Sequence, residues 1–130
     1  MKLNHAMVYS LDVGKALAFY RDQLGLKLLE EHRDGDLLLY ARLKLPKGKS
    51  TVALHKVEKG QKLVPGAIRL YFEVSDLAGT HRRLRKSGVV FTQPPKKMPW
   101  GWKHAYLNDP DGHEISLYEA GELRLRSAKA

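Results

Sequence analysis

The fold is decided by a segment that occurs twice, HAMVYSLD at residues 5–12 and RLYFEVSD at residues 69–76. Each copy reads as a half-buried strand that runs into an aspartate able to cap a helix. A second pair of segments, VALH at 52–55 and ISLY at 115–118, repeats with nearly the same spacing. The shared period and apolar phase indicate one structural unit present in two copies.

Hydrophobic periodicity and turn residues predict the same order of elements in both copies, a strand, a helix and three more strands. Asp12 is expected to cap the first helix and Gly25 to end it, while Pro94-Pro95 and residues 109–112 are read as turns. The expected elements are strands at 3–10, 26–33, 36–45 and 50–57 around a helix at 12–24, then strands at 67–74, 89–92, 102–108 and 114–119 around a helix at 76–88.

We therefore predict an α+β fold of two βαβββ modules, whose curved mixed sheets surround a cleft. The modules cover residues 3–57 and 67–119, joined by a linker at 58–66 and followed by a C-terminal extension at 120–130. Alternation along each strand sends one set of side chains under the helices and the other into the cleft. The predicted cleft set is His5, Met7, Leu38, Tyr40, Arg42, Thr51, Ala53, His55, Arg69, Tyr71, Glu73, Trp102, His104, Tyr106, Glu114, Ser116 and Tyr118.

Composition limits the classes of protein that this chain can be. At 130 residues, with 43% hydrophobic and 28% charged residues, it is expected to form one soluble globular domain. The absence of cysteine excludes disulfides, thiolate metal ligands and a cysteine nucleophile. No segment resembles a signal peptide or a membrane span, so a cytoplasmic protein without membrane contacts is expected.

The formal net charge of +9 raises the question of an anionic partner. The basic residues are scattered over expected loops, one helix face and the C-terminal end, and no helix-turn-helix, zinc finger or RNA-binding signature accompanies them. Solvated surface charge is the favoured interpretation, and nucleic acid is not expected as a partner.

Three short segments resemble the vicinal oxygen chelate superfamily, which includes glyoxalase I, extradiol dioxygenases and bleomycin-resistance proteins. They are LNH at residues 3–5, AFYRDQLG at 18–25 and LNDPDGH at 107–113. The resemblance covers residues 3–119 and implies the two-module fold. It says little about the reaction, because members of the superfamily include both enzymes and ligand-sequestering proteins.

The resemblance also implies where a metal ion would be held, on one position of the first, fourth, fifth and eighth strands. These positions are His5, Ala53, Arg69 and Ser116, so only His5 is a ligand of the expected kind. We therefore expect no cofactor. The alternative is a divalent ion (Mn, Ni, Zn or Fe) on a shifted site formed by His5, His55 and Glu114.

Arg69 favours an anion over a cation, because a guanidinium is always charged and only donates hydrogen bonds. A structural ion pair with Glu73 or Glu114 is the alternative for Arg69, and an ordinary hydrogen-bonded histidine is the alternative for His5. Trp100 and Trp102 could stack on a planar ligand or fill space between the modules.

Two hypotheses for function follow. The first is a metal-independent protein that binds a small anionic or aromatic molecule through His5, His55, Arg69, Trp100, Trp102, His104 and Ser116. The second is a lyase, isomerase or dioxygenase of the same superfamily, with Glu73 or Glu114 as general base and Tyr71 or Tyr118 as acid. A homodimer is expected, and the extension at 120–130 could pack on the partner or fray.

Overall fold

The computed structural model describes residues 1–121 and divides into two compact units, with the boundary between Val64 and Pro65. Each unit is a βαβββ module with a four-stranded mixed sheet, as predicted. The first unit contains β1 (His5–Ser10), α1 (Val13–Leu17), a π-helical turn η1 (Ala18–Gln23), β2 (Lys27–Asp34), β3 (Leu37–Lys44) and β4 (Thr51–Lys56). The second contains β5 (Arg69–Glu73), α2 (Leu77–Lys86), β6 (Phe91–Lys97), β7 (Lys103–Asn108) and β8 (Glu114–Glu119).

The two sheets have the same topology. Their strand orders are β1-β4-β3-β2 and β5-β8-β7-β6, with the first pair parallel and the others antiparallel. His5 pairs with Thr51 in the first sheet, and Arg69 pairs with Glu114 in the second. The hydrogen-bonded register thus reproduces the spacing of the repeated segments.

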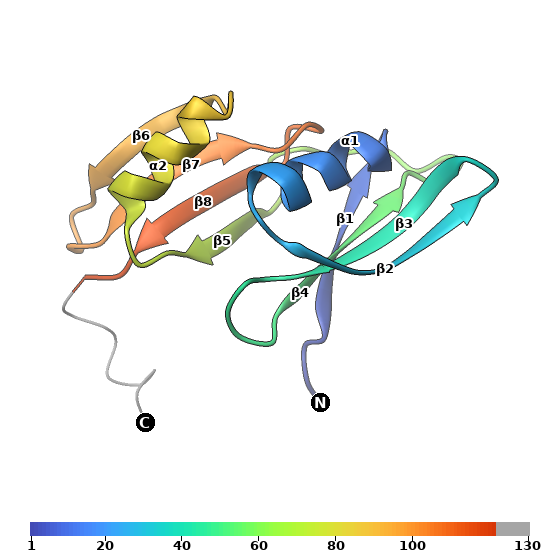
Figure 1. Cartoon of the computed structure of the whole chain (residues 1–130), viewed down its shortest axis with the longest axis horizontal. Helices are drawn as coiled ribbons and strands as arrows, with labels where there is room; N and C mark the ends of the chain where they lie inside the picture. The colour runs from blue at the N-terminus through green and yellow to red at the C-terminus, as the bar shows by residue number, and fades with distance from the viewer. Residues whose placement is uncertain (122–130) are drawn as a thin grey trace. The chain divides into compact units, whose positions relative to one another are not determined.

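In each unit the helix covers one face of its own sheet (Figure 1). The buried apolar residues of the first unit include Val8, Leu43, Val52 and Leu54 on the strands and Val13, Ala16 and Leu17 on the helix. Those of the second include Phe72, Ala105, Leu107, Ile115 and Leu117 on the strands and Leu77 and Leu84 on the helix. Alternation then leaves the opposite face of each sheet for other side chains.

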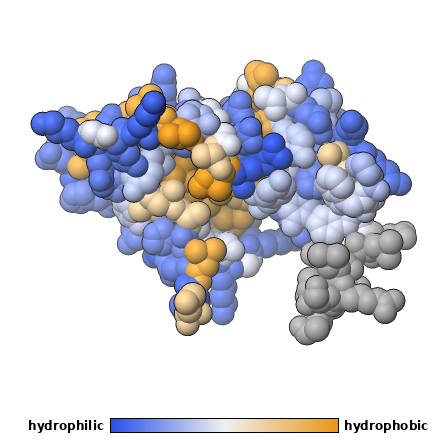
Figure 2. All heavy atoms as spheres, turned by 180° about the vertical axis from the view of Figure 1, so that it is seen from behind, coloured by the Kyte–Doolittle hydropathy of each residue, from blue (hydrophilic) through white to orange (hydrophobic). Residues whose placement is uncertain are grey.

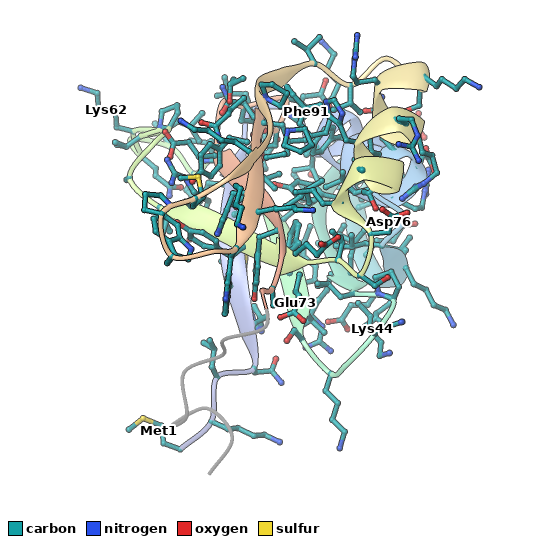
Figure 3. All side chains as sticks on the ribbon, turned by 90° about the vertical axis from the view of Figure 1, so that its left-hand side faces the viewer. Met1, Lys44, Lys62, Glu73, Asp76 and Phe91 are labelled. Carbon is teal, nitrogen blue, oxygen red and sulfur yellow. The ribbon has the colours of Figure 1, made fainter. Side chains whose placement is uncertain are left out.

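Equivalent aspartates begin both helices, as the repeat predicts. The Asp12 side chain accepts a hydrogen bond from the Lys15 N–H at 3.1 Å, and Asp76 Oδ1 accepts one from the Gly79 N–H at 3.0 Å. Figure 3 labels Asp76 at the start of α2. Gly25 follows η1 with φ +85°, which confirms it as the residue that ends the first helical segment.

The predicted turn at Pro94-Pro95 is wrong. These prolines do not end a strand, because β6 continues through both of them to Lys97. β6 is an edge strand with a register shift between Gln93 and Lys96, and an edge tolerates residues that lack an N–H.

Leu38 was wrongly placed on the open face of the first sheet. His32 pairs with Tyr40 but Arg33 pairs with Leu38, so Leu39 is an extra residue in β3. This bulge reverses the phase of the strand. Leu38 is buried and lies beside α1 instead.

No helix in residues 1–121 is long and apolar enough to cross a membrane. That the two open faces form one cleft stays a prediction. The predicted role of the C-terminal extension falls mostly on residues 122–130, outside the described part of the chain.

Candidate functional site

An aromatic pocket lies on the open face of the second sheet. Its volume is about 700 Å³, within the usual range for small-molecule sites. Strands β5, β7 and β8 and the loop before β7 supply its lining, which consists of Arg69, Tyr71, Trp100, Trp102, His104, Tyr106 and Tyr118. All but Arg69 carry aromatic rings.

Three of these rings form a continuous stack. Tyr118 lies between Trp102 and His104, with ring centroids 5.5 Å and 5.3 Å away and interplanar angles of 5° and 18°. Trp100 and Tyr71 meet His104 edge to face, at 5.6 Å and 6.0 Å. The pocket is thus lined by three stacked rings and by two rings that meet His104 edge-on.

Trp100 and Tyr71 are the exposed rings of this pocket, with 55% and 53% of their surfaces accessible. Figure 2 colours the opposite side of the molecule from Figure 1 by hydropathy, a scale on which tryptophan and tyrosine are pale because their hydropathy is intermediate. The exposed rings are therefore available to a ligand.

His104 is the most deeply buried polar residue of the pocket, with 5% of its surface accessible. Its Nδ1 lies 2.8 Å from Oγ of the fully buried Ser116. Its Nε2 is buried and has no hydrogen-bond partner within residues 1–121. Burial, and secondarily the charge of Arg69, lower the pKa of His104 below its ordinary value, so the imidazole is neutral near pH 7.

Arg69 is held by an ion pair and by two tyrosines. Its Nε and Nη2 both lie 3.0 Å from Glu114 Oε2, and its Nη1 lies 3.4 Å from the Tyr71 hydroxyl. Its guanidinium carbon is 4.4 Å from the ring centroid of Tyr106. Of the alternatives for Arg69, the structure shows the ion pair with Glu114, which neutralises the charge that was expected to attract an anion.

The four proposed acid–base residues form two separate contacts. Tyr118 donates a hydrogen bond to Glu73 at 3.1 Å, while Glu114 and Tyr71 both contact Arg69. Glu73 lies at the end of β5, close to the start of α2 (Figure 3). Both carboxylates are thus engaged within the sheet.

His5 and His55 lie on the first sheet and are not brought together. His5 pairs with Thr51 and His55 with Tyr9, which separates the two residues by about 13 Å along the strands. Nδ1 of His5 is 2.7 Å from Asn4 Oδ1, and Nδ1 of His55 is 2.6 Å from the Lys56 carbonyl oxygen. Side chains that rise from a sheet at that spacing do not share one ion.

The donor set also does not fit the metal site implied by the superfamily. Ala53 is buried without a donor atom, Arg69 is a cation, and the Ser116 hydroxyl is engaged with His104. Within residues 1–121 no three His, Asp or Glu side chains are grouped to hold a metal ion.

The sequence model of the Glyoxalase/Bleomycin resistance protein/Dioxygenase superfamily matches residues 2–117 of this chain. The chain belongs to this superfamily. A crystal structure of a superfamily member from Sphaerobacter thermophilus has a TM-score of 0.77 and 28% identity, and the match covers 92% of this chain and 98% of that one.

Two further relatives frame the question of function. The uncharacterised protein YetH of Bacillus subtilis is 29% identical, with 86% of this chain and 92% of YetH covered. TnmS3, an antibiotic binding protein from Streptomyces sp. CB03234, has a TM-score of 0.77 and 26% identity, with 93% of this chain and 97% of TnmS3 covered. The superfamily therefore includes both uncharacterised and ligand-binding members of this size.

Tyr106 is a pocket residue that the sequence placed in the cleft set but not among the binding residues. The His104–Ser116 contact was also missed. His104 pairs with Tyr118 and Tyr106 pairs with Ser116, so His104 and Ser116 are diagonal neighbours on one face. The register of β7 and β8 was the signal that could have revealed the contact.

Proposed function

We propose that this superfamily member binds a small planar aromatic molecule by stacking it against the rings of the second sheet. The observation that carries the proposal is the pocket of about 700 Å³, in which six of seven lining residues are aromatic. Aromatic rings give a planar ligand a large contact area at little cost in side-chain entropy. The similarity to an antibiotic binding protein supports the same class of function.

An enzymatic function is less well supported by these contacts. Glu73 hydrogen-bonds to Tyr118 and Glu114 pairs with Arg69, so each carboxylate already has a partner. The donor set lacks the ligands of a superfamily metal site. We therefore favour binding without chemistry.

The chain offers a direct test, because its two tryptophans both line the pocket. Their two indole N–H signals in a ¹H–¹⁵N spectrum report on this site alone. We expect 2-naphthol to shift both signals saturably. Decahydro-2-naphthol, which has the same skeleton but is not planar, should bind at least about tenfold more weakly, since a stacked ring contributes about 1–3 kcal/mol.

A matched pair of variants provides the control. Tyr118→Leu removes the central ring of the stack and should weaken 2-naphthol binding about tenfold. Tyr40→Leu removes a ring from the first sheet and should leave binding unchanged. Equal affinity for the planar and the saturated compound, or no binding of either, would reject the proposal.

A further inference from the structure

His104 carries a buried atom that the fold leaves unsatisfied. Nδ1 is engaged with Ser116 Oγ, while Nε2 is shielded from water and has no partner in the described chain. A buried polar atom without a hydrogen-bond partner destabilises the fold, so such atoms are rare and need an explanation. The same imidazole lines the aromatic pocket.

Ser116 orients the imidazole without satisfying it. Nδ1 is next to the ring's attachment point and faces the buried serine, whereas Nε2 is at the outer end of the ring. If the serine hydroxyl donates to Nδ1, Nε2 carries the proton and donates; if it accepts from Nδ1–H, Nε2 is an acceptor. Either form is neutral, because burial opposes protonation.

The charges of the pocket cancel. Arg69 is the only charged residue of the lining, and the Glu114 carboxylate lies 3.0 Å from its guanidinium. An anionic ligand would have to displace or approach that carboxylate, whereas a neutral ligand would not. The Arg69–Glu114 pair therefore selects against anions.

From these two observations we infer that the ligand is a neutral aromatic molecule with a hydroxyl or carbonyl group on its ring edge. This group hydrogen-bonds to His104 Nε2 after a neighbouring side chain moves aside, because a ligand oxygen cannot reach the shielded atom without such a movement. This inference rests on the proposed function and adds the polarity of the ligand to it. The exposed rings of Trp100 and Tyr71 provide the faces on which the ligand stacks, and the adjacent His104 supplies one polar atom.

A thermodynamic cycle with two ligands tests the hydrogen bond. 2-Naphthol and 2-methylnaphthalene have nearly the same shape, but only the first can bond to Nε2. We expect the preference for 2-naphthol to fall about tenfold in His104→Phe, which keeps an aromatic ring. His55→Phe, on the first sheet, is the control and should retain the wild-type preference.

The ¹⁵N signals of His104 in the wild-type protein give a second readout that does not depend on a variant folding. The Nε2 signal should shift with 2-naphthol and stay with 2-methylnaphthalene. Naphthalene-2-carboxylate should bind more weakly than 2-naphthol. If both neutral ligands bind with a preference that His104→Phe leaves unchanged, the inference fails while the stacking proposal stands; if neither binds, the stacking proposal itself fails.

Discussion

Arg69 lines the aromatic pocket, and the ion pair with Glu114 neutralises its charge. The pair is partly exposed, with 35% and 40% of the two side chains accessible, so it is expected to add less than about 1 kcal/mol to stability. Hydrogen bonding to Tyr71, together with Glu114, raises the pKa of Arg69 above its ordinary value. The guanidinium therefore stays charged, and the net charge of the pair can be changed only through Glu114.

Glu114→Gln should convert the pocket to an anion site. The amide keeps the shape of the carboxylate but leaves the charge of Arg69 uncompensated. We expect naphthalene-2-carboxylate to bind several-fold more tightly than to wild type, measured by the two indole N–H signals. An unchanged affinity in a folded variant would show that Glu114 does not control the charge of the site.

Ser116 is expected to matter more for stability than its size suggests. Ser116→Ala leaves Nδ1 of His104 without a partner in a buried environment, which should cost about 1–3 kcal/mol in urea unfolding. Thr51→Val also removes a hydroxyl, but its bond to the Asn4 carbonyl is exposed and water can replace it. Equal losses in the two variants would contradict the importance of the buried contact.

At the scale of elements, the repeated aspartates give the two helices the same start. Each carboxylate accepts a backbone N–H that the helix itself cannot satisfy. Asp12→Ala and Asp76→Ala should each lower the free energy of unfolding by about 1 kcal/mol, whereas the two Asn variants should retain most of the stability. Urea denaturation measures both, and a loss in only one unit would mean that the caps are not equivalent.

The elements also show which parts of the structure a sequence can predict. Alternation and capping residues correctly predicted the order of the strands and helices, because those signals are local. The bulge at Leu39 and the passage of β6 through Pro94-Pro95 depend on how a neighbouring strand pairs, which no local pattern records.

The candidate site follows the same division. Strand phase correctly assigned Arg69, Tyr71, His104, Tyr106 and Tyr118 to one face, because it requires only alternation along each strand. The neutralisation of Arg69 by Glu114 and the lack of a hydrogen-bond partner for His104 Nε2 in the described chain depend on contacts across strands. Whether Arg69 would meet Glu73 or Glu114 depended on register, and the register favours Glu114.

At the scale of the whole molecule, two histidines make stability depend on pH. Burial lowers the pKa of His104 and of His81, with smaller contributions from Arg69 and from Arg85 and Arg82. Each is protonated more readily in the unfolded chain, whose histidines titrate near 6.5. Stability from these groups is therefore complete above about pH 6.5 and is lost as pH falls through their folded-state pKa values.

Urea unfolding at pH 7.5 and at pH 5.5 measures this dependence. The wild-type protein should be less stable at the lower pH, and His104→Phe and His81→Phe should each show a smaller difference between the two pH values. If neither variant changes the difference, other groups control the acid sensitivity of the chain.

The equal topology of the two sheets has a consequence for protein engineering. Met7 and His55 occupy the positions of Tyr71 and Tyr118, and Tyr40 occupies that of His104, since each pairs with the equivalent strand neighbour. The same scaffold thus carries an aromatic face in one copy and a mixed face in the other. The aromatic residues of the second sheet could therefore be introduced at the equivalent positions of the first sheet, one substitution at a time, to build a second binding face.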